Sequence, residues 1–497
     1  MTAPSRAELP PGTRLPRLAQ LVRMSMDPYG FLKSQRDRYG DLFTIHMPGM
    51  DRQVFVCEPE AVKRLTTGGY EDYTRDADAV RFILGDHAVI FEQDAPHKDT
   101  RRLMMPPFHG ERMRAYGHDM AHFTDEIVDG WRDGEKRVLH KELQEITLRV
   151  ILRSVFGVSE GPRFEELGRL FVEYLDAMMT PWFYASTLVL SGPRVRDFLR
   201  LRGRAKRKDP TRKISRLPLQ SAADRLAAID NILFDEIAIC RGLGDEARAE
   251  RSDILALLVA ARYDDGSRIS DEALRDHLMT LLIGGHETTA TSLAWAMSCA
   301  LQHPGTLERM RAEVDTVFAD GFDPAKVKQL VFIGAVANES MRLYPIATAV
   351  TRILKVDMKL AGRTIPAGTR VSPCIYLTQR DARLWDDPDA FKPDRFLAGK
   401  PSVYEFFPFG AGVWRCLGAQ FAEYEMRVIL ARLVSRMDMT LEAGVAIKPM
   451  QRGFTVAPSD GVPVRVRHRA QVPTTKTQVV VPEPPMLSVA NRRAPST

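Results

Sequence analysis

The chain has 497 residues, of which 44% are hydrophobic and 27% are charged, and its formal net charge is +6. This composition is typical of a globular protein with a large core, and it excludes a largely disordered, collagen-like or coiled-coil chain. Five scattered cysteines without a CxxC pair argue against a disulfide framework, a zinc site or an iron–sulfur cluster, and they favour a reducing, cytoplasmic compartment.

The positive charge is concentrated in one segment. Residues 194–216 hold eleven Lys and Arg against two Asp. The net charge of this segment exceeds the net charge of +6 of the whole chain, so the rest of the chain is net acidic. One basic segment is not a nucleic-acid-binding face, and no nucleic-acid partner is predicted. No apolar run approaches the ~20 residues that span a bilayer, and the N-terminus is polar and proline-rich. We therefore expect no signal peptide and no transmembrane anchor.

In chain order, the residue pattern predicts a mainly α-helical protein with small β-sheets, an α+β fold. A hairpin is expected from strands at 41–46 and 53–57 around a Pro48–Gly49 turn. Helices are predicted over 28–39, over much of 60–180 (one from near His97 to just before Pro106), and over 222–241 and 253–262.

The longest predicted helix runs from Ser270 to about His303. Ser270 suits an N-cap, Asp271 and Glu272 suit the first turn, and Pro304 follows the end. Roughly 34 residues at 1.5 Å each would give about 50 Å, enough to cross a domain. Because the segment is apolar almost all round, we expect a buried central helix.

The C-terminal third is predicted to contain a small sheet, a long coil and one more helix. Residues 345–378 alternate and turn as strands do, 380–412 form a coil rich in Pro, Asp and Phe, and a helix covers 417–437. Residues 471–497 have no pattern and are predicted to be a disordered tail. Residues 1–470 are expected to form a single domain.

Cys416 is the residue to which the chemistry points first. It follows a loop containing Gly410 and Gly412 and directly precedes the last predicted helix, whose free N–H groups and dipole would stabilise a thiolate. Such a thiolate can bind haem iron as an axial ligand, and the glycines would let a flat cofactor approach the backbone. A lone cysteine is more often an inert buried side chain, so neighbouring motifs must decide.

Five motifs, in order, resemble those of the cytochrome P450 family, and the resemblance covers roughly residues 10–468. The segment with Phe409, Gly412, Cys416 and Gly418 resembles the haem-binding signature. The other four are His97–Arg101 (the propionate-binding helix), Gly284–Thr289 (the oxygen-activating stretch), Glu339–Arg342 (the ExxR motif) and Phe391–Phe396 (the segment that completes an ion triad). The resemblance implies the cytochrome P450 fold, with a long central helix over haem b and the cysteine loop and its helix beneath.

The resemblance also implies residue roles. Cys416 would be the haem iron axial ligand, and Glu287 and Thr288 would be catalytic, feeding protons to bound oxygen. The implied cofactor contacts are His97, Arg101 and Arg352 on the propionates and Phe409, Gly412, Gly418, Gly284 and Gly285 around the ring; the implied structural triad is Glu339, Arg342 and Arg395. Trp414 departs from the family, which usually has Arg or His there, so a charge-assisted propionate contact is lost.

The sequence fits a zinc site, a hydrolase site or a dinucleotide site less well. His286 and Glu287 begin an HExxH zinc motif, but Ala290 stands where the second histidine is required. No GxSxG motif occurs, and the loop from Gly410 to Arg415 lacks the third glycine of a dinucleotide site. Taken alone, Gly284–Thr289 is better explained as a glycine-kinked core helix with back-bonded hydroxyls, and the presence of Cys416 is what favours the catalytic interpretation.

By the same resemblance, the substrate would be a hydrophobic small molecule such as a fatty acid, terpenoid or steroid. The implied pocket residues are Phe82, Ile83, Val89, Ala347, Ala349, Val350 and Phe454, although an ordinary core would explain the same side chains. The basic segment 194–216 would flank the entrance, either attracting anionic substrates or a membrane surface or forming a solvated loop.

No flavin or iron–sulfur domain is visible, so electrons from NAD(P)H would arrive through a ferredoxin or flavodoxin with its reductase, as in soluble bacterial members. The predicted activity is a monooxygenase that uses O2 to hydroxylate or epoxidise its substrate. One alternative is a peroxide-using or isomerising haem-thiolate enzyme, which would need no proton relay. The other is a non-catalytic haem- or ligand-binding protein.

Overall fold

The computed structural model describes residues 9–48, 50–77, 80–157, 161–178, 217–453 and 455–469, with 194–195, 197–199, 201–202 and 214–215. The side chains of Phe82 and Pro218 are outside this description. Most of the basic segment 194–216, Phe454 and the predicted tail 471–497 also lie outside the described residues.

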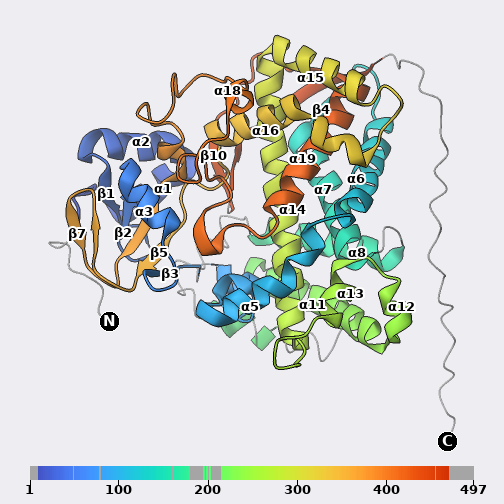
Figure 1. Cartoon of the computed structure of the whole chain (residues 1–497), viewed down its shortest axis with the longest axis horizontal. Coiled ribbons are helices and arrows are strands. Elements are labelled where there is room, and N and C mark those ends of the chain that lie inside the picture. Colours follow the sequence, from blue (N-terminus) through green and yellow to red (C-terminus); the bar gives the residue numbers. More distant parts are fainter. Residues whose placement is uncertain are drawn as a thin grey trace, which may run out of the picture.

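Helices make up most of the molecule and gather around α14 (Asp271–Gln302), which crosses it from end to end (Figure 1). The other long helices are α6 (Arg112–Asp129), α7 (Leu139–Phe156), α8 (Pro162–Met178), α11 (Pro218–Gly242), α15 (Pro304–Val317), α16 (Val331–Leu343) and α19 (Ala419–Arg436). The shorter ones are α1 (Arg17–Met26), α2 (Pro28–Tyr39), α3 (Pro59–Thr67), α4 (Arg81–Leu84), α5 (Asp94–Met104), α12 (Asp245–Ala249), α13 (Ile254–Ala260), α17 (Ile375–Thr378) and α18 (Arg395–Ala398). Among these described helices, none has both the length and the apolar composition needed to cross a bilayer.

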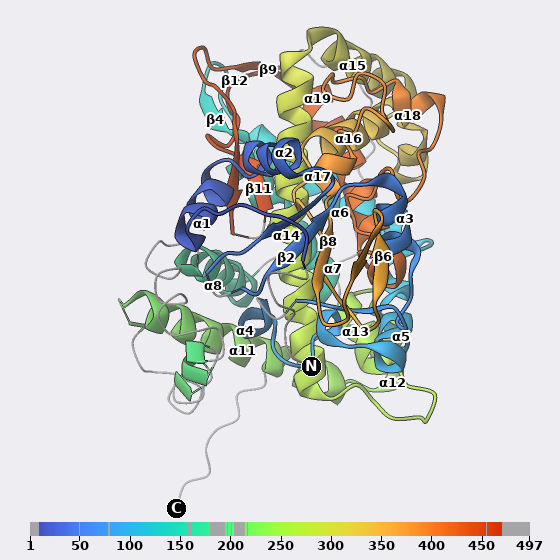
Figure 2. The ribbon, with the colours of Figure 1, turned by 90° about the vertical axis from the view of Figure 1, so that its left-hand side faces the viewer.

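Four small sheets accompany the helices. The largest has the order β1 (Leu42–Ile45), β2 (Gln53–Val56), β8 (Arg370–Pro373), β5 (Arg352–Leu354), β3 (Tyr73–Arg75), and only its β2–β8 pair is parallel. Figure 2 shows β2 and β8 in front of α14. The others are β4 (Lys136–Val138), β12 (Pro463–His468) and β9 (Met437–Leu441); β6 (Met358–Leu360) and β7 (Arg363–Ile365); and β10 (Pro449–Arg452) and β11 (Thr455–Pro458).

The central helix forms where the sequence predicts it. The Ser270 hydroxyl accepts a hydrogen bond of 3.1 Å from the Ala273 N–H, and Asp271 and Glu272 occupy the first turn near the positive end of the helix dipole. The helix is continuous to Gln302, and most of its side chains are buried. The predicted fold class, the hairpin and the last helix are likewise confirmed.

One segment was predicted wrongly. Within 345–378 only β5 to β8 are strands; 345–351 contains none, and Ile375–Thr378 is the helical turn α17. All four side chains of α17 are buried, and an apolar run buried on every side does not distinguish a strand from a helical turn. The predicted coil 380–412 is confirmed except for the single turn of α18 and for Gly412, at which a 3-10 turn (Gly412–Trp414) begins.

Two apolar clusters meet at the segment before α19. The larger packs around α14, and Phe409 and Leu417 lie against it. The smaller lies under the five-stranded sheet and includes Phe407, Ala411 and Trp414. Residues 407–417 therefore connect the helical and the sheet-rich parts of the molecule.

Candidate functional site

Backbone geometry fixes the loop that carries Cys416. Gly410 and Gly412 have φ angles of 69° and 71°, in the left-handed region that disfavours side chains. A Cβ on Gly412 would also lie 2.9 Å from the Thr66 carbonyl oxygen. The Cys416 N–H donates to the Phe409 carbonyl at 2.9 Å. The loop thus requires its glycines, and it holds the cysteine just ahead of α19.

Cys416 differs from the other four cysteines, which are buried, because its side chain is exposed. The pKa of its thiol is raised, since the protein around the sulfur disfavours a charge. The Gly418 N–H and the cations Arg75, Arg101 and Arg415 act in the opposite direction. A bound metal ion would complete this environment, because coordination deprotonates a thiol outright.

A cluster of guanidinium groups lies beside this cysteine. Arg75 on β3 is the direct strand partner of Arg352 on β5, and Arg101 donates to the Arg415 carbonyl at 2.7 Å. Arg352 donates to the Ala411 carbonyl at 3.0 Å, and its Nε is buried without a partner.

None of Arg75, Arg101 and Arg352 pairs with a carboxylate within the described part of the chain. Burial, followed by the charge of Arg352, lowers the pKa of Arg75 to about 10. Like charges held together without a counter-ion are unfavourable, so the cluster fits a strongly anionic group. The two propionates of a haem would fit this donor set, with Cys416 as the ligand that would hold its iron.

Tyr70 and His97 extend the cluster. The Tyr70 hydroxyl lies 2.6 Å from His97 Nδ1, and burial lowers the pKa of His97 to about 4, so the ring is neutral near pH 7. In the tautomer in which the phenol donates to Nδ1, the ring N–H is on Nε2. The indole of Trp414 lies edge-on to Tyr70 with centroids 5.1 Å apart, and its buried N–H has no partner among the described residues.

Sequence reasoning identified His97, Arg101 and Arg352 but missed Tyr70 and Arg75. Neither belongs to a motif, and both reach the cluster through non-local contacts. The only signal for Arg75 was the pairing of its strand with the strand of Arg352, which the sequence did not reveal.

The predicted catalytic stretch lies in the middle of α14. Gly284 is exposed, and the Thr288 hydroxyl donates to its carbonyl oxygen. Gly285 instead faces α7, where a Cβ would come within 2.7 Å of Ile151 Cδ1. Glu287 is buried, and both of its oxygens face other side chains rather than Thr288.

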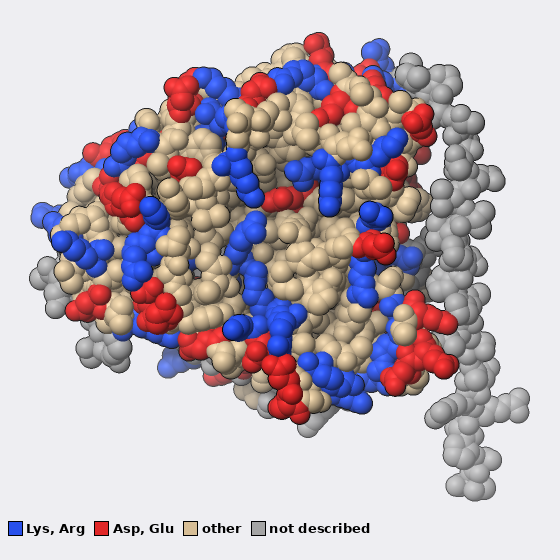
Figure 3. Space-filling view, in the orientation of Figure 1, with Lys and Arg blue, Asp and Glu red and all other residues tan. Residues whose placement is uncertain are grey.

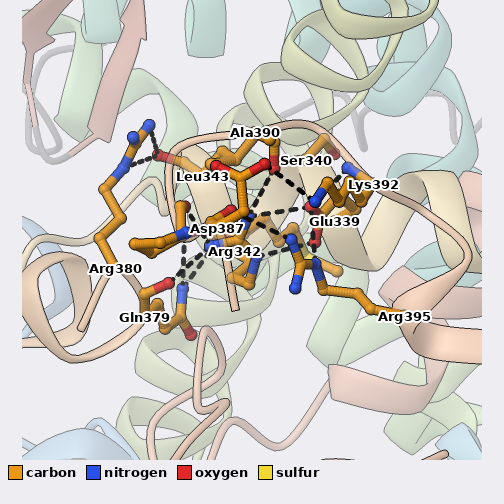
Figure 4. A network of polar contacts seen from close by, with 12 residues as sticks. Glu339, Ser340, Arg342, Leu343, Gln379, Arg380, Asp387, Ala390, Lys392 and Arg395 are labelled. Atoms are coloured by element: carbon orange, nitrogen blue, oxygen red, sulfur yellow. Dashed lines mark hydrogen bonds and ion pairs between the residues drawn. The ribbon is translucent and has the colours of Figure 1, made fainter. Parts of the chain in front are cut away.

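The predicted ion triad is assembled in the core (Figure 4). Glu339 and Arg342 are both fully buried, and the carboxylate accepts from Arg342 Nε at 2.7 Å and Nη2 at 2.8 Å. It also accepts from Arg395 Nε at 3.1 Å. Arg342 donates to the Gln379 carbonyl at 2.8 Å, and the Gln379 side chain accepts from the Phe407 N–H at 3.1 Å. The triad is therefore connected to the start of the cysteine loop.

The predicted pocket residues lie against different clusters. Ile83 and Val89 are buried in the large cluster around α14. Ala347 and Val350 are half-buried against the cluster under the sheet, and Ala349 against a third cluster that contains Tyr29 and Phe43. Their role as pocket residues stays a prediction.

Comparison with known proteins agrees with these features. The family model described as cytochrome P450 matches residues 9–462. A Mycobacterium tuberculosis protein named cytochrome P450 135B1 is 34% identical over 477 residues, 96% of this chain and 95% of that protein. Another from the same organism, named cytochrome P450 137, is 31% identical over 433 residues, 86% of this chain and 84% of that protein.

Solved structures show the same fold. A cyanobacterial CYP120A1 with retinoic acid bound aligns with a TM-score of 0.76 and 23% identity, covering 93% of this chain and 99% of that one. The haem domain of cytochrome P450DA aligns with a TM-score of 0.77 and 22% identity, covering 93% and 98%.

Proposed function

The chain belongs to the cytochrome P450 family, and on this premise we propose that it is a haem-thiolate monooxygenase whose iron ligand is Cys416. The observation that carries the proposal is the exposed Cys416 beside three arginines, none of which has a carboxylate partner in the described chain. We further propose that residues 1–470 form its one domain and that haem b is its cofactor.

The propionates would be bound by Arg75, Arg101 and Arg352, with the His97 Nε2–H as a fourth donor. Tyr70 is compatible with this arrangement, because a hydroxyl that donates to His97 Nδ1 pairs with the tautomer that carries its hydrogen on Nε2. When bound, the haem supplies an iron centre at which O2 can be reduced and cleaved.

Thr288 and Glu287 would manage protons at the other face of the site. Thr288 is half-buried next to the exposed Gly284, and its hydroxyl could hold a water there. Glu287 would supply the proton, since burial raises its pKa and keeps a larger fraction of it protonated. Such a relay favours an O2-dependent monooxygenase over a peroxide-using or isomerising enzyme.

We propose a hydrophobic substrate that is hydroxylated or epoxidised, with Ile83, Val89 and Val350 among its contacts. Electrons from NAD(P)H would arrive through a ferredoxin or flavodoxin with its reductase. Figure 3 supports an acidic partner, since Lys and Arg side chains run down the middle of the face that carries α5. Lys98 on α5 and Arg415 ahead of α19 are exposed, and neither pairs with a carboxylate in the part of the chain that is described.

The test is the spectrum of the reduced protein under carbon monoxide. We expect the red-shifted Soret peak of a thiolate-bound haem in the wild type and in Cys240→Ala, a control in which a buried cysteine is removed. Cys416→Ser should lose the peak. A Cys416→Ser variant that keeps it would refute the assignment of the ligand, and a wild type without it would refute the proposed function.

A further inference from the structure

The carboxyl group of Glu287 is held by side chains of α7 and of its own helix. Gln144 Nε2 donates to Glu287 Oε2 at 2.5 Å. On the other oxygen, the Thr291 hydroxyl lies 3.4 Å from Oε1. His140 Nε2 is 3.1 Å from the same hydroxyl and 3.7 Å from Oε1. A carboxyl, a hydroxyl and an imidazole therefore form one continuous chain.

This chain is closed off from bulk water. Glu287 is 5% exposed, His140 1% and Thr291 0%. His140 Nδ1 is buried and has no partner among the described residues, so the ring's only hydrogen bond leads through Thr291 toward Glu287. Buried polar atoms are usually hydrogen-bonded, and leaving Nδ1 without a partner has an energetic cost. Packing alone therefore explains a histidine at this position poorly.

Burial acts on both ends of the chain. It raises the pKa of Glu287, and it lowers the pKa of His140 to about 3. The positive charge of Arg452 on β10 opposes protonation of His140 and favours ionised Glu287, while the exposed Asp176 on α8 disfavours that ionisation. His286 is the remaining titratable neighbour; it is also kept neutral by burial, and its ring faces Thr147 instead.

Two protonation states of the chain are related by a balanced shift of one proton. In one, Glu287 is a carboxylic acid that donates to Thr291, whose hydroxyl donates to the bare Nε2 of a neutral His140. In the other, Thr291 has given its hydrogen to Nε2 and taken the one from Glu287, which leaves a carboxylate and an imidazolium. No other group gains or loses a proton in this shift, so Glu287 and His140 share one proton, and the imidazolium can return it to the carboxylate through Thr291.

We propose that His140 is the proton partner of Glu287, linked to it through the Thr291 hydroxyl, and that Gln144 is a positioning residue that keeps the carboxyl aimed at this chain. The proposal deepens the proposed monooxygenase function and rests on it. His140 lies on α7, outside every motif that identifies the family, so the relay belongs to this chain's own residues.

The first test is infrared difference spectroscopy of the full-length protein as pH is varied. The C=O stretch of a buried carboxylic acid should be visible, should shift in D2O and should be absent from Glu287→Gln. His140→Gln keeps a hydrogen bond to Thr291 but carries no proton, so it should shift the midpoint at which this band titrates. The matched control is His277→Gln, because His277 is also a fully buried histidine but lies on α14. This substitution should leave the midpoint unchanged.

The second test is coupling, the fraction of NAD(P)H electrons that appear in product rather than in peroxide. With a surrogate ferredoxin chain, His140→Gln should lower coupling by about 10-fold, the scale at which partners of a functional group commonly act. An unchanged midpoint together with unchanged coupling would overturn the relay. The carbon monoxide spectrum separates the two proposals: if the thiolate peak is present while both readouts stay at the wild-type value, the relay fails and the monooxygenase assignment stands.

Discussion

Replacing Glu339 with alanine should destabilise the protein severely, because it leaves the buried charge of Arg342 without its carboxylate partner. Arg342 is fully buried, and without Glu339 its guanidinium would keep hydrogen bonds to backbone carbonyls, among them those of Gln379 and Pro388, but would lose its carboxylate partner. Removing one partner of a buried ion pair typically costs about 3–5 kcal/mol, against a total stability of about 5–15 kcal/mol for a domain. Glu339→Ala should therefore lose roughly a fifth of the stability or more.

The same substitution should also prevent haem incorporation rather than merely slow turnover. Glu339 accepts from the Lys392 N–H at 2.8 Å as well as from Arg395, so its loss frees the coil that leads to Cys416. Denaturant unfolding and the ratio of Soret to protein absorbance measure the two effects. Asp394→Ala is the control, since it removes only an exposed pair with Arg309 and should cost about 0–1 kcal/mol. A haem-replete Glu339→Ala protein within 1 kcal/mol of the control, roughly the value of an exposed pair, would refute the reasoning.

Three further predictions follow from single contacts. Trp414→Arg should slow haem release to a scavenging globin by roughly 10-fold, since a charge-assisted hydrogen bond contributes about 1.5–3 kcal/mol; an unchanged release rate would show that Trp414 is not a weak point. Gly285→Ala should lower the free energy of unfolding by about 1–3 kcal/mol, because its Cβ would meet an α7 side chain at 2.7 Å, whereas Gly284→Ala, with nothing within 4 Å, should not; equal losses in denaturant melts would contradict this. Burial lowers the pKa of His277 from 6.5 to about 4, so between these pH values the unfolded chain binds a proton that the folded chain does not, and stability falls as pH drops. His277→Leu should flatten that fall by up to about 1.4 kcal/mol per pH unit, and melts that keep the wild-type slope would count against it.

The fold was largely predictable because its main elements carry local signals. The central helix has a capping Ser270 and an acidic first turn, and the sequence of the hairpin has Pro48 and Gly49, two residues typical of turns, between its two strand segments. Residues 375–378 were not predictable as a helical turn, because their side chains are buried on every side and show no period. Strand order in the largest sheet was also beyond local reasoning, since β3 and β5 are far apart in the chain.

The residues of the candidate site also divide into those that the sequence predicts and those that it does not. Cys416, Glu339 and Thr288 lie in motifs whose spacing is readable, and the triad contacts form as predicted. Arg75 and His140 lie in no motif, and each acquires its importance only from a partner on another element. Sequence reasoning therefore found the candidate residues that lie in motifs, and it missed Arg75 and His140, for which we propose roles that depend on contacts between distant elements.

Trp414 shows how this chain accommodates a departure from its family. The Trp414 indole, at the position where the family usually has Arg or His, packs against Tyr70 and Tyr73. The Arg352 guanidinium lies 4.8 Å from the centroid of the Tyr73 ring. Arg75, the strand partner of Arg352, already adds a cation beside the loop, and its pKa is lowered by burial and, secondly, by the charge of Arg352. A further arginine at 414 would increase that repulsion in the haem-free protein while strengthening the hold on an anionic cofactor. Tryptophan thus favours a stable loop before haem binds, at the expense of one charged contact afterwards, and its buried N–H still has a hydrogen bond to offer the cofactor.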